Sequence, residues 1–108
     1  MEIHVIGIPP YKQAYADAKE RMNQQERANA LKVVATEQKC TLIKKEKVRL
    51  VITYYRCRDR SDSSNIIGGV CDALNGLAYI DDRQIDEIHY SEEKGLVDEY
   101  MIKIKEKP

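Results

Sequence analysis

The chain contains no Trp and no Phe, so seven Tyr residues supply every aromatic ring in its 108 residues. It also lacks a long apolar run: stretches free of charge, such as residues 63–71, are far shorter than the roughly 20 residues that span a bilayer. The first residues do not show a basic stretch followed by an apolar one, which is the pattern of a secretory signal. We therefore expect a cytoplasmic protein with no membrane partner.

Residues that bind zinc or exchange disulfides are sparse. The three cysteines, Cys40, Cys57 and Cys71, are far apart and form no CxxC pair, and His4 and His89 stand alone. Zinc knuckles and redox dithiols need paired ligands at short spacing. The sequence therefore predicts reduced, buried thiols and isolated histidines on strands or on the surface.

The chain has no excess of charge, with 18 basic and 18 acidic side chains, whereas a general nucleic-acid binder usually shows a basic excess. The charges are nevertheless separated along the sequence. The basic run comprises Lys39, Lys44, Lys45, Lys47, Arg49, Arg56, Arg58 and Arg60. The acidic run comprises Asp81, Asp82, Asp86, Glu87, Glu92, Glu93, Asp98 and Glu99. Two interpretations stay open: both runs are solvated faces, or one meets phosphates and the other holds cations.

Apolar residues make up 43% of the chain and charged residues 33%, which is typical of one globular domain, here spanning residues 1–108. Hydrophobic spacing predicts, in order, a strand over 2–8, a helix over 12–38, a strand over 47–58, a helix over 65–75 closed by Gly76, and strands over 84–90 and 96–105. The order β-α-β-α-β-β, with the last two strands as a hairpin, predicts an α+β fold: a small mixed β-sheet with two helices.

The second predicted helix has two unlike faces. Its apolar face carries Ile66, Ile67, Val70, Ala73 and Leu74. The opposite face carries Asn65 and Asp72, with the adjacent Gly68 and Gly69 between them. Each glycine destabilises a helix by roughly 0.5–1 kcal/mol relative to Ala. We expect this bare face to admit a close neighbour, which could be a phosphate, a strand or the same helix of a second subunit.

Four acids surround this helix in sequence: Asp62, Asp72, Asp81 and Asp82. If the chain folds back after Gly76, they could converge. Clustered carboxylates repel one another unless they share protons or bind a divalent cation. Oxygen ligands suit Mg²⁺ or Mn²⁺, which can polarise a phosphodiester and lower the pKa of a bound water. The competing interpretation of the Asp81–Asp82 pair is ordinary turn chemistry.

The same segment carries a recognisable motif. The chain has Asp62, Asn65, Asp72-Ala73-Leu74, Asp81-Asp82 and Gln84-Ile85 at the spacing of the pattern D-x-D-N-x-x-K-x-x-x-D-A-L followed by D-D-x-Q-[IV]. In this it resembles the RusA-like crossover-junction endodeoxyribonucleases of bacteria and prophages. The resemblance implies a homodimeric, Mg²⁺-dependent (Mn²⁺ possible) Holliday junction resolvase that acts in DNA recombination and repair and binds branched DNA.

Residue by residue, the resemblance implies that Asp62 and Asp82 are metal ligands and that Asp72 is a supporting acid, so these three form the catalytic set. With Asp81 they form the candidate metal set. The residues expected to contact DNA phosphates are Lys44, Lys45, Lys47, Arg49, Arg56, Arg58 and Arg60. Such contacts supply affinity but little sequence information.

The chain departs from the pattern at two positions. Ser64 stands where the family has a second acid, and Gly68 stands where it has a lysine. Asp72 or Asp81 could replace the acid. A basic residue of the Arg56, Arg58, Arg60 series, or one from a second subunit, could replace the lysine.

Three functions follow as alternatives. The first is an active Mg²⁺-dependent structure-specific endonuclease. The second is a non-catalytic binder of branched DNA that has lost turnover. The third is a protein-interaction module that uses the glycine face and the acidic hairpin and has no nucleic-acid partner.

Overall fold

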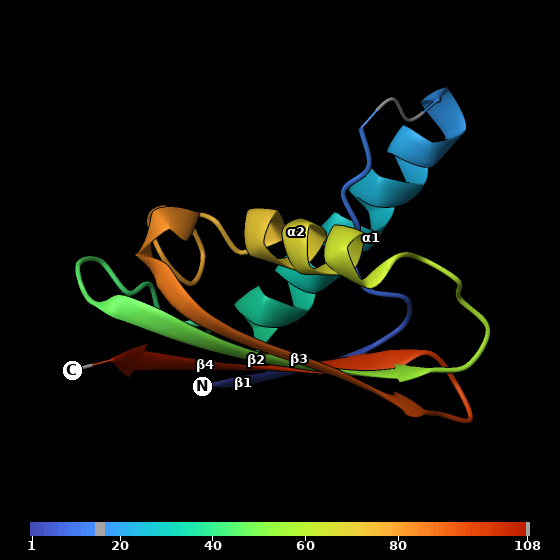
Figure 1. Ribbon diagram of the computed structural model, residues 1–108. Coiled ribbons are helices and arrows are strands. Elements are labelled where there is room, and N and C mark those ends of the chain that lie inside the picture. Colours follow the sequence, from blue (N-terminus) through green and yellow to red (C-terminus); the bar gives the residue numbers. More distant parts are fainter. Residues whose placement is uncertain (15–16, 108) are drawn as a thin grey trace.

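The structure of the protein is a computed structural model, and it describes residues 1–14 and 17–107. Four strands form one mixed sheet, and two helices cover one of its faces (Figure 1). The elements are β1 (Glu2–Ile6), α1 (Ala18–Glu37), β2 (Lys47–Arg56), α2 (Ser63–Ala73), the short 3₁₀ helix η1 (Asp82–Gln84), β3 (Ile85–Lys94) and β4 (Glu99–Lys107). The predicted α+β fold and its element order are confirmed.

The strands lie in the order β1-β4-β2-β3. Strand β4 runs antiparallel to both β1 and β2, whereas β3 runs parallel to β2. The predicted terminal hairpin is therefore wrong, because β2 lies between β3 and β4. The reason is the character of the strands: β2 buries alternate apolar side chains and lies at the centre, while the polar β3 suits an edge. Helix α2 supplies the crossover that parallel strands require.

Helix α1 begins later than the spacing predicts. Asp17 caps it, accepting a hydrogen bond of 2.8 Å from the backbone N–H of Glu20. A side chain that accepts from the backbone in this way marks a helix start. Of the predicted helix, residues 12–14 lie in a segment without regular structure that follows Pro10, and residues 15 and 16 lie outside the described residues.

The core lies between the sheet and the helices. Its strand side chains come mainly from Val48, Leu50, Ile52, Tyr54, Tyr100, Ile102 and Ile104, and its helix side chains from Leu31, Ala35, Ile66, Val70, Ala73 and Leu74. Burial of a large apolar side chain contributes about 1.5–3 kcal/mol. In the described part of the chain, no helix is long and apolar enough to cross a membrane.

All three cysteines are free thiols. The expectation that they are buried holds for Cys71 alone, since Cys40 is half-buried and Cys57 is exposed just after β2. A cysteine at a strand end is not obliged to pack into the core, and spacing along the sequence could not distinguish these three positions.

Candidate functional site

The glycine face of α2 is covered by the chain's own N-terminal segment. A Cβ atom at Gly69 would lie 2.5 Å from both N and Cα of Tyr11, and 2.6 Å from the carbonyl carbon of Pro10. The backbone N–H of Lys12 donates to the carbonyl of Asn65 at 2.9 Å. The predicted close approach is confirmed, and the neighbour is this segment rather than a phosphate, a strand or a second helix.

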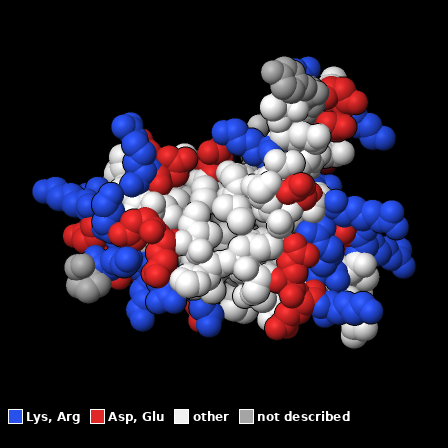
Figure 2. All heavy atoms as spheres, in the orientation of Figure 1, with Lys and Arg blue, Asp and Glu red and all other residues white. Residues whose placement is uncertain are grey.

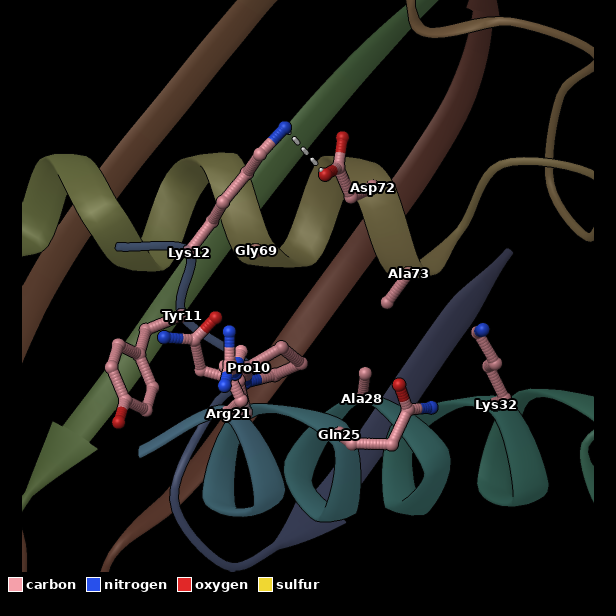
Figure 3. Close-up of a pocket in the computed structure, with 11 residues that line it drawn as sticks. Pro10, Tyr11, Lys12, Arg21, Gln25, Ala28, Lys32, Gly69, Asp72 and Ala73 are labelled. Carbon is pink, nitrogen blue, oxygen red and sulfur yellow. Dashed lines mark ion pairs between the residues drawn. The ribbon is translucent and has the colours of Figure 1, made fainter. Parts of the chain in front are cut away.

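Lys12 extends from this segment along α2 and meets Asp72 (Figure 3). Its Nζ lies 2.8 Å from Oδ2 of Asp72, with the lysine side chain 65% exposed and the aspartate 43%. The hydrogen bond to Asp72 and the charge of that carboxylate raise the pKa of Lys12, and the more distant charge of Asp82 adds to them. Lys12 is therefore a cation at neutral pH, held beside an acid and open to solvent.

The acid pair Asp81–Asp82 follows α2 and opens η1. The Asp81 side chain caps η1, accepting from the backbone N–H of Arg83 at 2.9 Å, and also pairs with Nη2 of Arg83 at 3.2 Å. These backbone and side-chain hydrogen bonds lower the pKa of Asp81. The neighbouring Asp81 raises the pKa of Asp82, with a smaller contribution from Asp72, while Lys12 opposes the shift. Asp72, Asp82 and Lys12 thus lie within electrostatic reach of one another.

Asp62 lies at the opposite end of α2. It caps the helix, accepting from the backbone N–H of Ser64 at 2.9 Å and from the Ser64 hydroxyl at 2.7 Å, and these hydrogen bonds lower its pKa. Helix α2 has 11 residues, so its ends are roughly 15 Å apart. The structure therefore does not bring Asp62 to the other three acids. Within the described residues, no group of three or more His, Cys, Asp or Glu side chains is placed to hold a metal ion.

The acids at the C-terminal end of α2 nevertheless fit Mg²⁺ chemistry. This ion keeps several waters and often uses only one or two carboxylates together with substrate phosphates. Asp72 and Asp82 are exposed and offer carboxylate oxygens. A divalent cation would also relieve the repulsion that raises the pKa of Asp82. The donors thus suit a metal shared with a phosphate rather than an all-protein cage.

The two charged runs of the sequence meet across β2 and β3. Arg49 lies 3.2 Å from Glu87, and Arg56 contacts both oxygens of Glu92 at 2.7 and 2.9 Å. Arg56 also pairs with Asp59 at 3.3 Å. Parallel pairing of the two strands therefore neutralises part of the basic run with the acidic one.

The other predicted DNA-binding residues are exposed at the two ends of β2. Lys44, Lys45 and Lys47 lie at its beginning, and Arg58 and Arg60 lie beyond its end. A strand of 10 residues separates the two groups by roughly 30 Å. Figure 2 shows charged side chains gathered at both ends of the molecule and an uncharged area between them.

A cavity of about 330 Å³ lies between the N-terminal segment, α1 and α2 (Figure 3). Its cationic lining residues are Lys12, Arg21 and Lys32, and Asp72 lies at the same opening. Sequence reasoning missed all three cations. The adjacent glycines signalled that something would approach α2, but no local pattern showed that Lys12 would accompany it.

Exposed carboxylates beside a lysine, on a small α+β fold, are compatible with phosphodiester cleavage assisted by a divalent cation. The family model of endodeoxyribonuclease RusA matches residues 9–105, and the chain belongs to this family. No curated protein matches the chain. Membership implies a divalent-metal-dependent nuclease that resolves Holliday junctions.

Proposed function

We propose that this chain is an active Mg²⁺-dependent, structure-specific endodeoxyribonuclease that resolves Holliday junctions during DNA recombination and repair in the cytoplasm. The observation that carries the proposal is the exposed Lys12–Asp72 pair, whose charges also act on the pKa of the exposed Asp82. Mn²⁺ could replace Mg²⁺, since both prefer oxygen ligands.

Within one subunit, Asp72 and Asp82 are the proposed metal ligands. A cation bound there supplies the polarisation of the phosphodiester and a more acidic water. Asp81 acts on Asp82 through its charge, while its own side chain is engaged in capping η1. Lys12 orients the Asp72 carboxylate through their 2.8 Å contact.

We further propose a homodimer in which Asp62 serves the site of the other subunit. The surface over α2 and the middle of β3 carries almost no charge (Figure 2). Strand β3 also lies at the edge of the sheet. A two-fold axis perpendicular to α2 would set two copies of the helix antiparallel, which brings Asp62 of each subunit toward Asp72 and Asp82 of the other. Such a dimer presents two equal sites, as a four-way junction with approximate two-fold symmetry requires.

The DNA arms would contact the exposed cations at the two ends of β2: Lys44, Lys45, Lys47, Arg58 and Arg60. Arg49 and Arg56, predicted from sequence for the same role, are held by glutamates and contribute less. Arg21 and Lys32 would add phosphate contacts, because they line the same cavity as Lys12 and Asp72.

The experiment is incubation of the protein with a synthetic four-way junction, with and without Mg²⁺, beside a linear duplex. We expect paired nicks on the junction alone that require the metal and are lost in Asp82→Asn and in Asp62→Asn. Asn caps a helix as well as Asp does, so Asp62→Asn removes the charge and keeps the cap. Asp86→Asn, an equal change at an exposed acid of β3, serves as the control.

The other outcomes distinguish the alternatives. Tight binding of the junction without nicking in Mg²⁺ or Mn²⁺ would identify a non-catalytic binder of branched DNA. Absence of binding at modest salt would contradict both DNA functions and favour a protein-interaction module.

A further inference from the structure

We propose that Lys12 is the catalytic cation of this site and that it acts from the position which a lysine at residue 68 would occupy. The inference rests on the proposed nuclease function. It explains how a chain with Gly68 at the lysine position of the motif can keep a positive charge beside its acids.

The first step is that the side chain of Lys12 and that of a lysine at residue 68 would begin at nearly the same point. A Cβ atom built on Gly68 would have the Cβ of Lys12 as its neighbour, at 3.8 Å. A side chain from either residue therefore starts from nearly the same place above α2. Asp72 lies four residues beyond Gly68, so both face the same side of the helix. From that start Lys12 reaches Asp72 at 2.8 Å (Figure 3).

The second step is how firmly Lys12 is placed. Its backbone N–H bonds to the Asn65 carbonyl, and the backbone just before it packs onto Gly69 with no room for a Cβ atom. On the other side, the guanidinium of Arg27 lies 4.5 Å from the centre of the Tyr11 ring. The backbone is thus held between α1 and α2, while the Lys12 side chain stays 65% exposed and accessible to a phosphate.

The third step concerns other basic residues, namely the Arg56, Arg58, Arg60 series considered above for this role and Arg83, which follows Asp82. Arg56 is paired with Glu92 and Asp59, and Arg83 is paired with Asp81. Arg58 and Arg60 precede α2, at the Asp62 end, so within one subunit they lie away from Asp72. Lys12 faces the acids at the opposite end. An ammonium group fixed there can donate to a phosphodiester oxygen as negative charge builds up on it, which is the effect that accelerates the reaction most.

The test compares wild type, Lys12→Ala, Lys12→Arg and the double variant Lys12→Ala/Gly68→Lys. The measurements are single-turnover nicking at saturating junction, the junction Kd and the thermal unfolding midpoint. Lys105→Ala, on the sheet face away from the helices, is the matched control. We expect Lys12→Ala to slow nicking about 100-fold or more, the usual loss when one such donor is removed. Lys12→Arg keeps part of the rate, and the double variant regains most of it.

A purely structural role predicts a different pattern. Lys12→Ala keeps the backbone hydrogen bond to Asn65, so its unfolding midpoint should stay close to that of wild type, and a lysine from α2 could not rescue a structural defect at residue 12. Wild-type nicking by Lys12→Ala, or a double variant no faster than Lys12→Ala, would overturn the Lys12 role alone. A wild type that nicks no junction in either metal would overturn the proposed function and the Lys12 role with it.

Discussion

Gly68 and Gly69 are adjacent in α2, but the space around them differs, so a side chain is excluded at one and tolerated at the other. At Gly69 a methyl group would overlap the backbone of Pro10 and Tyr11. At Gly68 the same group would make an ordinary contact with the Lys12 side chain. Helix propensity opposes both glycines equally, so only packing separates them.

We expect Gly69→Ala to destabilise the fold by about 1–3 kcal/mol, the usual consequence of overpacking. Gly68→Ala should stabilise it by up to about 1 kcal/mol through helix propensity. Urea unfolding of the two variants, compared at equal slope, measures both effects. Equal shifts in the same direction would show that the N-terminal segment does not pack on α2 as described.

Sequence reasoning at this scale succeeded where helix spacing alone decided the outcome. The face carrying Asp72 and the glycines, and the close approach to it, follow from about 100° per residue. Lys12 could not be predicted, because its place depends on where the segment after Pro10 returns to the helices. The separation of Asp62 from Asp72 does follow from helix length, once Asp62 is recognised as the cap.

At the scale of elements, the parallel pair β2–β3 decides which cations remain for DNA. Arg56 has its side chain 21% exposed and is bound to two carboxylates, whereas Arg58 is exposed two residues further on. The same residue type therefore has a structural role at one position and is free for binding at the other.

We expect Arg58→Gln to reduce the dependence of junction affinity on salt by about 0.9 in log–log slope, the loss of one phosphate contact. Its unfolding free energy should not change. Arg56→Gln should leave the slope unchanged and destabilise the fold by about 1–3 kcal/mol, because Glu92 and Asp59 lose their partner. Binding titrations across a salt series measure the slope, and urea unfolding measures the change in stability. A smaller slope in Arg56→Gln would contradict the assignment of a structural role to Arg56 and a DNA-binding role to Arg58.

The sequence predicted which helices and strands exist better than it predicted which strands lie side by side. Alternating side chains identified each strand, but alternation carries no information on which strand lies beside which. The hairpin prediction took adjacency in sequence for adjacency in space. The start of α1 was placed too early because residues before Asp17 continue the apolar spacing of the helix. The Asp17 side chain caps the N-terminus, so the helix begins after it.

At the scale of the whole molecule, the uncharged surface between two charged ends is the face assigned to the proposed dimer. Ile88 on the edge strand β3 is 40% exposed within that surface, and Ile6 on the opposite edge strand β1 is 76% exposed. Replacing each of these isoleucines by lysine in turn tests which edge of the sheet forms the dimer interface.

We expect light scattering to give about twice the 12.5 kDa mass of one chain for wild type and for Ile6→Lys. Ile88→Lys should give the monomer mass, since an unpaired charge buried in an interface is unfavourable. A monomeric wild type at the concentrations used for nicking would contradict the proposed dimer, and disruption by Ile6→Lys alone would move the interface to β1.

The central position of β4 also sets the order in which the protein can be completed during synthesis. Strand β1 pairs with β4 alone, and the register joins Glu2 to Lys103. Strand β1 therefore cannot pair until β4 has been synthesised. Contacts this far apart in sequence form late and slow folding. The segment that carries Lys12 begins soon after β1, so a nascent chain that has not yet formed β4 lacks the strand partner that anchors this segment.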